Sequence, residues 1–294
     1  MINIIQKKLN KNIGSLIIGL SIIALLFTTL FSGCVQQQEG LSIVLIGRDS
    51  TSGTREFFWT FVMGKANFSA NLLEKNSNGA IQQTVAQTPS AIGYVGLGYV
   101  DATVKALTID NITANVQNIL DKTYPISREL YMFTNGNATG LAKEFIMYIQ
   151  STEGQAIVTE EGFVPLQNTV HYNTTGKTLS GTLTVSGSTT VLPIADKAAT
   201  SFKALHPSVT VTVTGGGSGV GISAVIQKTV DIGMSSRDLQ TSESNLKVLV
   251  KYIIAKDGIV IIVNPQNTYV TGLTMAQLKA IYLGDITDWK DLSK

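Results

Sequence analysis

The sequence predicts an α/β fold built on parallel sheets, and two observations support that prediction. First, strand-like apolar runs alternate with helical segments in both halves of the chain, and helices of this length between strands imply parallel pairing. Second, each half has a turn of glycine and hydroxyl residues between a strand and a helix, at 48–55 and 186–190. Such turns leave backbone N–H groups free at a helix N-terminus, where they can bind an anion. We therefore expect two walls around one small oxyanion.

The N-terminal residues have the pattern of an export signal. Three lysines precede an almost unbroken apolar run, 13–31, and small residues then lead to Cys34, the only cysteine of the chain. We predict a signal peptide over 1–33, lipidation at Cys34 and a tether over 34–40, which places the protein on the extracytoplasmic face of the cell membrane. The alternative is an uncleaved membrane anchor, since the run is about as long as a bilayer requires.

Composition favours a folded domain with no affinity for nucleic acid. The 294-residue chain is 44% apolar and only 14% charged, so it can bury a sizeable core. Its net charge of +2 comes from 22 basic and 20 acidic residues. Removal of the predicted signal peptide takes away three lysines and no acid, which leaves 19 against 20, or −1. We expect no nucleic-acid partner.

In the first half, apolar periodicity and glycine positions predict the elements. The helix after the first turn carries an apolar stripe that includes Phe57, Phe58 and Phe61, and a glycine-punctuated apolar stretch at 91–100 indicates a buried strand and turn. The polar stretch 171–180 has no apolar periodicity, so we predict a linker there. The expected elements are a strand at 41–46, a helix from about Ser52, an amphipathic segment at 80–87, the strand at 91–100, a strand at 129–134 and helices at 141–149 and 153–160.

The second half repeats this alternation. Pro193 is typical of the first turn of a helix, and 209–213 alternates valine with threonine as a half-buried strand does. The expected elements are a strand at 182–185, a helix at 194–205, the strand at 209–213, a glycine turn at 215–221, a helix at 222–229, a strand at 231–234, a helix around 242–250, a strand at 258–263 and a helix at 275–282.

Four loops carry candidate anion ligands. Hydroxyl and backbone N–H groups at helix starts donate to oxyanions, and an arginine such as Arg48 can pair with one bidentately. A hydroxyl residue at a helix start is often a plain N-cap, so only the four loops together indicate an anion site. The candidates are Ser188, Thr189, Thr190, Ser218, Ser236, Arg237, Arg48, Ser52, Gly53 and Thr54.

An enzyme is the rival class, and the sequence gives it little support. The segment 219–224 imitates the dinucleotide fingerprint G-x-G-x-x-A, but no acidic residue closes a following strand at the expected distance. His171 and His206 are both expected at the surface, and there is no cluster of cysteine and histidine. We predict no catalytic residue, no metal and no cofactor.

Taken together, these segments resemble the phosphate-binding proteins of ABC importers, which are two-lobed periplasmic binding proteins of type II. The resemblance spans nearly all of residues 41–292. The matching segments are S-G-S-T-T-V-L-P, G-G-G-S-G-V-G-I, D-I-G-M-S-S-R-D-L, I-T-D-W-K-D, R-x-x-x-S-G-T-R, A-I-G-Y-V-G-L-G-Y-V and Y-P-I-S-R-E-L-Y.

The resemblance implies two lobes, each a mainly parallel sheet flanked by helices, with the ligand cleft between them. Lobe one would be 125–263, and lobe two would be 41–124 with 264–294. The chain would pass between the lobes near Tyr124 and near Val263.

The order of the matching segments differs from that of the family, because the half that begins with S-G-S-T-T comes second here. We interpret this order as a circular permutation within one chain, joined through the linker 171–180. The alternatives are halves that pair between two chains, as in a swapped dimer, and a slice of a tandem fusion.

The resemblance also implies the function. The protein would be a monomeric, lipid-anchored solute-binding protein that captures inorganic phosphate and delivers it to the transmembrane subunits of an ABC permease. Thr189, Thr190, Ser218, Ser236, Arg48, Ser52, Gly53 and Thr54 fall on positions that contact phosphate in the family. Some members carry an aspartate where Ser236 stands, so sulfate, molybdate or tungstate is an alternative ligand. A tethered phosphate sensor without transport is another alternative.

Overall fold

The computed structural model describes residues 42–293. The predicted signal peptide (1–33), the tether (34–40) and the lipidation site Cys34 lie outside the described residues. Within the described range, no helix combines the length and the apolar content that crossing a bilayer requires. Anchoring of the chain to a membrane therefore stays a prediction.

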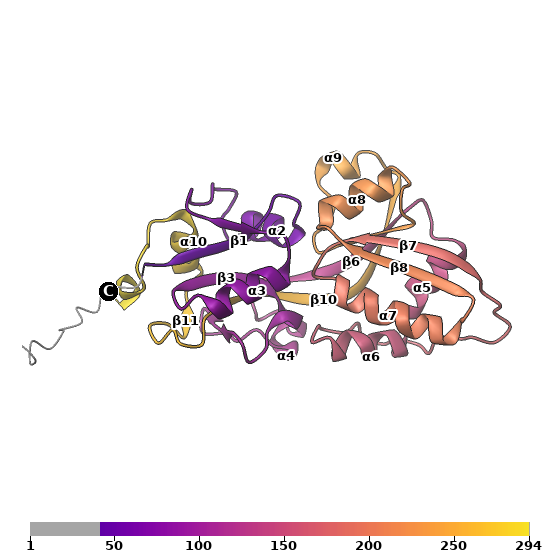
Figure 1. Cartoon of the computed structure of the whole chain (residues 1–294), viewed down its shortest axis with the longest axis horizontal. Helices are drawn as coiled ribbons and strands as arrows, with labels where there is room; N and C mark the ends of the chain where they lie inside the picture. Colours follow the sequence, from indigo (N-terminus) through magenta and orange to yellow (C-terminus); the bar gives the residue numbers. More distant parts are fainter. Residues whose placement is uncertain (1–41, 294) are drawn as a thin grey trace, which may run out of the picture. The chain divides into compact units, whose positions relative to one another are not determined.

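Strands from both halves of the chain join in one nine-stranded sheet (Figure 1). Its order is β2-β1-β3-β10-β6-β9-β7-β8, β4 also pairs with β10, and β5 and β11 form a separate pair. The strands are β1 (Val44–Arg48), β2 (Leu73–Lys75), β3 (Ala91–Gly96), β4 (Lys105–Ala106), β5 (Thr108–Ile109), β6 (Ser127–Asn135), β7 (Gly181–Gly187), β8 (Val209–Gly215), β9 (Ile232–Ser235), β10 (Leu249–Val263) and β11 (Gly272–Leu273).

Parallel pairing is confirmed for two groups of three strands. β1 lies parallel to β2 and β3, and β7 lies parallel to β8 and β9. β10 and β6 run antiparallel to each other and to their outer neighbours, β3 and β9. The sheet is therefore mixed, with antiparallel strands where the two parallel groups meet.

Hydroxyl side chains begin several of the helices. Ser52, Ser77 and Thr274 each accept a hydrogen bond from a backbone N–H in the first turn, and Gly284, with φ of 89°, ends the last α-helix in the left-handed region. The helices are α2 (Gly53–Phe61), α3 (Asn78–Gln87), α4 (Val116–Leu120), α5 (Gly140–Gln150), α6 (Thr152–Glu160), α7 (Leu192–Leu205), α8 (Ser218–Ile226), α9 (Thr241–Ser244) and α10 (Met275–Leu283), with short 3₁₀ turns η1 (Leu97–Tyr99) and η2 (Trp289–Ser293).

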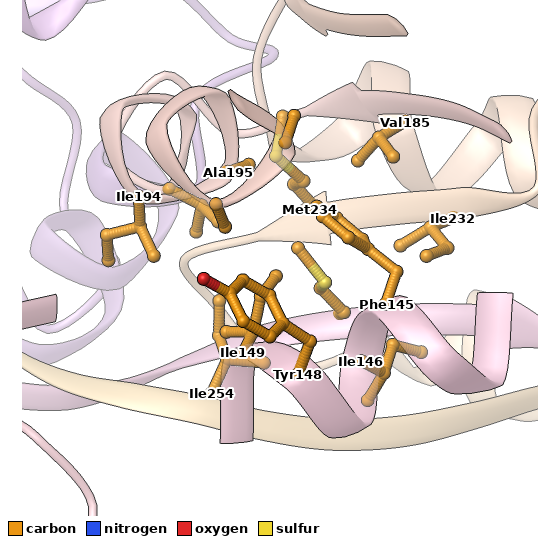
Figure 2. Packing of buried hydrophobic residues seen from close by; sticks show 14 of the residues in the cluster. Phe145, Ile146, Tyr148, Ile149, Val185, Ile194, Ala195, Ile232, Met234 and Ile254 are labelled. Atoms are coloured by element: carbon orange, nitrogen blue, oxygen red, sulfur yellow. The ribbon is translucent and has the colours of Figure 1, made fainter. Parts of the chain in front are cut away.

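Two large apolar cores define the two lobes. The core of lobe one lies between the sheet and helices α5, α6 and α7. The core of lobe two lies around α2, α10 and the strands β1, β3 and β10, and includes the fully buried Phe58, Tyr94 and Tyr282. Figure 2 shows how the core of lobe one packs α5 against α7 and the strands, through Phe145, Ile146, Tyr148, Ile149, Val185, Ile194, Ala195, Ile232, Met234 and Ile254.

β10 connects the two lobes by changing its partner along its length. From Leu249 to Gly258 it pairs with β6 of lobe one, and from Ile259 to Val263 it pairs with β3 of lobe two. The change of partner falls between Gly258 and Ile259, earlier in the chain than the crossing near Val263 that the sequence predicts. β6 enters lobe one after Ile126, whose side chain still belongs to the core of lobe two. The limits predicted for the lobes stay a prediction.

The helix predicted around 242–250 is wrong in its second half. α9 ends at Ser244, and β10 begins at Leu249. Lys247 lies between them with φ of 53°, in the left-handed region that a helix cannot continue through. The apolar residues that follow form a strand because they pair with β6, which local periodicity cannot show.

The expected linker 171–180 has no helix or strand, but it packs on lobe one. The Tyr172 ring contacts Tyr148, Phe202 and His206, and its hydroxyl donates to Glu144 at 3.0 Å. His206 is therefore only 4% exposed, and the expectation that it lies at the surface is wrong. His171, in contrast, is exposed and pairs with Glu153 at 2.8 Å.

Candidate oxyanion site

One wall of the candidate site is the turn between β1 and α2. Arg48 ends β1 and is 1% exposed; its Nε donates to the carbonyl of Lys75 at 3.2 Å and its Nη2 to that of Asn76 at 3.1 Å. Ser52 caps α2 by accepting from the N–H of Arg55 at 3.2 Å. The turn therefore provides a buried guanidinium at the end of β1 and the N–H groups at the start of α2, and each of these favours an anion.

The second wall begins with the turn between β7 and α7. Gly187 has φ of 140°, and a Cβ there would lie 2.2 Å from the carbonyl oxygen of Met234, so only glycine fits. Ser188 Oγ accepts from the N–H groups of Thr190 at 3.2 Å and Val191 at 3.4 Å. These bonds hold the turn in a form that presents the hydroxyls of Thr189 and Thr190.

Ser218 and Ser236 complete the second wall. Ser218 is the first residue of α8, and Ser236 follows β9 directly. Ser218 Oγ accepts from the N–H of Ser236 at 3.0 Å and lies 3.3 Å from Ser236 Oγ. Both serines are buried, so two hydroxyl groups lie side by side in lobe one.

The two walls meet through contacts that join the lobes. A Cβ on Gly53 of α2 would lie 2.2 Å from Ser218 Oγ and 2.9 Å from Ser236 Oγ. The hydroxyls of Thr54 and Thr190 are 3.1 Å apart. Beside them, the carbonyl of Thr51 accepts from the N–H of Gly219 at 3.0 Å. The structure is therefore a closed arrangement, in which four loops from distant parts of the sequence surround one place.

The residues brought together are polar, and nearly all are buried. Burial of hydroxyl and guanidinium groups is costly unless they are hydrogen-bonded, and these groups are bonded mainly to one another and to the backbone. Burial also lowers the pKa of Arg48, while nearby Asp49 opposes that shift. The exposed fractions are 1% for Arg48, 2% for Ser52, 0% for Thr54, 1% for Ser188, 7% for Thr189, 1% for Thr190, 0% for Ser218 and 1% for Ser236.

Arg237 differs from the other predicted site residues in where its side chain is engaged. Its Nη1 and Nη2 donate to the two carboxylate oxygens of Glu243 at 2.7 and 2.8 Å, and Nη1 also donates to the carbonyl of Asp238 at 2.8 Å. This bidentate ion pair uses the face of the guanidinium that would otherwise bind an oxyanion. Arg237 directly follows Ser236 in the chain, but its guanidinium is engaged by Glu243 and Asp238 of its own loop.

Two nearby acids are oriented by their own turns. Asp231 accepts from both the N–H and the hydroxyl of Thr184 at 2.8 Å, so it braces the start of β9 against β7. Asp49 accepts from the N–H of Thr51 at 2.9 Å, and its Oδ2 lies 3.9 Å from Arg48 Nη2. Among residues 42–293, no three or more His, Cys, Asp or Glu side chains gather as metal ligands do.

Sequence reasoning missed three buried polar residues at this site. Asn78 Nδ2 donates to the hydroxyls of Thr189 at 3.1 Å and Thr190 at 3.0 Å. Arg128 pairs with Asp257 at 2.7 Å, and both side chains are almost completely buried. Burial raises the pKa of the Asp257 carboxyl, and the guanidinium of Arg128 opposes that shift. Asn78 could have been found from the sequence, because it is a polar residue at the start of an amphipathic helix.

A two-lobed α/β fold with buried polar side chains gathered where its lobes meet is typical of solute-binding proteins. The family model described as the PBP superfamily domain matches residues 23–153 and 173–294. The phosphate-binding protein PstS 2 of Streptococcus pneumoniae serotype 4 is 35% identical over 291 residues, which cover 96% of this chain and 98% of the relative. PstS 2 of Streptococcus agalactiae serotype V is 34% identical over 288 residues, covering 94% and 97%.

A solved structure agrees with these relatives. The crystal structure of a phosphate-binding protein of a phosphate ABC transporter from Streptococcus pneumoniae is 35% identical, with a TM-score of 0.69, and the match covers 85% of this chain and 99% of that one. The chain therefore belongs to the PBP superfamily and, within it, to the family of the phosphate-binding proteins PstS.

Proposed function

We propose that this protein binds inorganic phosphate between its two lobes and delivers it to the transmembrane subunits of an ABC permease. The observation that carries the proposal is the meeting of two donor walls, with Gly53 and Thr54 of α2 on one side and Thr190, Ser218 and Ser236 on the other. The names of the relatives support the choice of phosphate, since they are phosphate-binding proteins.

Binding without catalysis follows from the chemistry of the donors. Hydroxyl, N–H and guanidinium groups can replace the water around an oxyanion, and none of them is arranged as a nucleophile with a base. The ligand contacts both walls, so it stabilises the closed form more than any open form, which is the differential affinity that closure requires. We propose no cofactor and no metal, and we keep sulfate and molybdate as the competing ligands because Ser236 provides no carboxylate to repel them.

We also propose that the two sequence halves are permuted within a single chain. Ser42 forms an antiparallel bridge with Asp288, and the N–H of Ile43 donates to the carbonyl of Thr287 at 2.8 Å. These contacts support the proposal, because a permuted chain needs its two ends side by side. Leu41, which was expected beside Leu292, lies outside the described residues. Lipidation at Cys34 and an extracytoplasmic location belong to the same proposal.

The Arg48→Met variant tests the binding function. It removes the buried cation of the first wall and keeps most of the side-chain volume. We expect phosphate affinity to fall by about 100-fold or more, because hydrogen bonds to a charged ligand are each worth about 1.5–3 kcal/mol. Equilibrium binding of labelled phosphate measures the change, and thermal unfolding checks that the variant is folded.

Lys203→Met is the matched control. Lys203 is an exposed residue in the last turn of α7, so this variant loses the same charge outside the site. Wild-type affinity in Arg48→Met would contradict the proposed function, whereas equal losses in both variants would indicate an effect of net charge alone.

A further inference from the structure

Asn78 spans the two lobes at the candidate site. It is the first residue of α3 in lobe two and is completely buried. Its Nδ2 donates to Thr189 Oγ1 and Thr190 Oγ1 of lobe one, at 3.1 and 3.0 Å. We propose that Asn78 is a positioning residue, which fixes these two hydroxyls as donors, Thr189 toward the ligand and Thr190 toward Thr54, and ties the two walls together. This inference rests on the proposed function.

The orientation of the Asn78 amide is set by the backbone. Its Oδ1 accepts from the N–H of Gly96 at 3.3 Å, and an N–H group can only donate. The oxygen must therefore face Gly96, and the NH₂ group must face the threonines. Ser77, whose hydroxyl accepts from the N–H of Ala80 at 3.1 Å, caps the helix and holds Asn78 at its first position.

The amide determines what the threonine hydroxyls can do. A hydroxyl has one proton and two lone pairs, so it can either donate or accept toward a ligand. Thr189 and Thr190 each accept from Nδ2, and Thr190 also accepts from Arg128 Nη2 at 3.4 Å. Both lone pairs of Thr190 are then occupied, so its remaining interaction is donation, and the acceptor in this structure is Thr54 Oγ1 at 3.1 Å.

Arg128 likewise occupies a lone pair of a hydroxyl on the other wall, that of Thr54. Its Nη2 donates to Thr54 Oγ1 at 3.1 Å, and Asp257 Oδ2 holds the guanidinium at 2.9 Å from Nε and 2.7 Å from Nη2. A guanidinium has no acceptor atom, so every contact that it makes leaves the hydroxyl proton free to point elsewhere. Thr54 Oγ1 then accepts from both Thr190 and Arg128, so the protons of Thr54 and Thr189 are left to donate to an anion.

The Asn78→Asp variant reverses this arrangement with little change in volume. The carboxylate accepts from the threonine hydroxyls, so it turns the Thr189 proton away from the ligand and the Thr190 proton away from Thr54. It also adds a negative charge beside the ligand. We expect phosphate affinity to fall by about 10- to 100-fold relative to the wild type at neutral pH. As the pH falls from about 8 to about 5, the new carboxyl becomes increasingly protonated. The phosphate affinity of the variant should therefore approach that of the wild type. A purely structural role for Asn78 would give Asn78→Asp and Asn78→Ala the same loss of affinity at every pH.

Asn264→Asp is the matched control. Asn264 is 4% exposed and lies near the other end of α3, where its Nδ2 donates to the carbonyls of Val85 at 3.1 Å and Ala86 at 2.7 Å. The same substitution there should lower the midpoint of thermal unfolding and leave phosphate affinity unchanged. Loss of affinity in both variants to the same degree would overturn the positioning role, since it would indicate a general effect of destabilisation.

Titration of the full-length protein, with phosphate and with sulfate, separates the possible failures. If the wild type binds neither anion, the proposed function is wrong, and this inference with it. If the wild type binds and Asn78→Asp binds equally well at every pH, the positioning role alone is wrong. Asn78→Ala, which lacks the NH₂ group and adds no charge, decides the matter should Asn78→Asp not fold. It should lose about 10-fold without a pH-dependent ratio, and wild-type affinity would overturn the inference.

Discussion

Gly53 has no room for a side chain, and the reason lies in the opposite lobe. The hydroxyls of Ser218 and Ser236 occupy the space that a Cβ would take, at 2.2 and 2.9 Å. Gly53 itself is the first residue of α2, a position with ordinary backbone geometry where alanine is otherwise well accepted. The glycine is thus required by the approach of the two walls rather than by the helix.

Gly53→Ala should therefore weaken binding without unfolding the protein. The added methyl group must displace the two serines or hold the lobes apart, and overpacking of this kind costs about 1–3 kcal/mol, or roughly 10- to 100-fold in affinity. Titration calorimetry with phosphate measures the loss. Gly79→Ala is the control, because a Cβ at Gly79 in α3 meets no atom within 4 Å. Unchanged affinity in Gly53→Ala would mean that the walls do not approach as described when ligand binds.

At the scale of elements, the segment 171–180 combines a sequence typical of a linker with specific contacts to lobe one. Glu153 at the start of α6 accepts from the N–H of Tyr172 at 2.9 Å and pairs with His171 at 2.8 Å. These bonds lower the pKa of Glu153 to about 2. The carboxylate therefore helps to hold the segment against the lobe.

The lowered pKa of Glu153 predicts that a small part of the folding stability is lost in acid. A carboxyl whose pKa is lower in the folded state stabilises the fold above its unfolded pKa, near 4.5, and loses that contribution as the pH falls toward about 2. Glu153 is largely exposed, so we expect no more than about 1 kcal/mol. Urea unfolding of wild type and Glu153→Gln across this range measures it. The variant should be less stable at neutral pH and converge with the wild type in acid, and a constant difference would contradict the assignment.

Local patterns predicted the elements whose structure depends on nearby residues. The turns at 48–55 and 186–190 are read from glycine and hydroxyl positions, and both form as expected. The segment after α9 was not predictable, because its strand depends on pairing with β6, which is more than 100 residues away in sequence. Asn78 was missed for the same reason: the threonines that it contacts lie 111 and 112 residues further along the chain.

At the scale of the whole molecule, a buried ion pair lies on the strands that connect the two lobes. β6 and β10 lie where the lobes join (Figure 1). Arg128 is on β6 and Asp257 is on β10, and their side chains pair at 2.7 Å. Removal of one partner would leave the other charge buried and unpaired, which typically costs about 3–5 kcal/mol. The ion pair therefore stabilises β6 and β10 beside the place where the two donor walls meet.

The order of the two sequence halves also bears on the oligomeric state. The bridge between Ser42 and Asp288 joins the two ends of the described chain in lobe two, whereas the segment 171–180 covers lobe one. All four loops of the site then come from one chain, so a monomer should be competent to bind. A swapped dimer would need a second copy to complete each site.

The most direct test of this account is calorimetric titration of the purified full-length protein with phosphate, sulfate and molybdate, with its molar mass in solution recorded alongside. We expect a monomer to bind one phosphate per chain. One phosphate per chain in an obligate dimer would contradict the intramolecular arrangement alone. Absence of binding to all three oxyanions would contradict the central claim that the two walls form an oxyanion site.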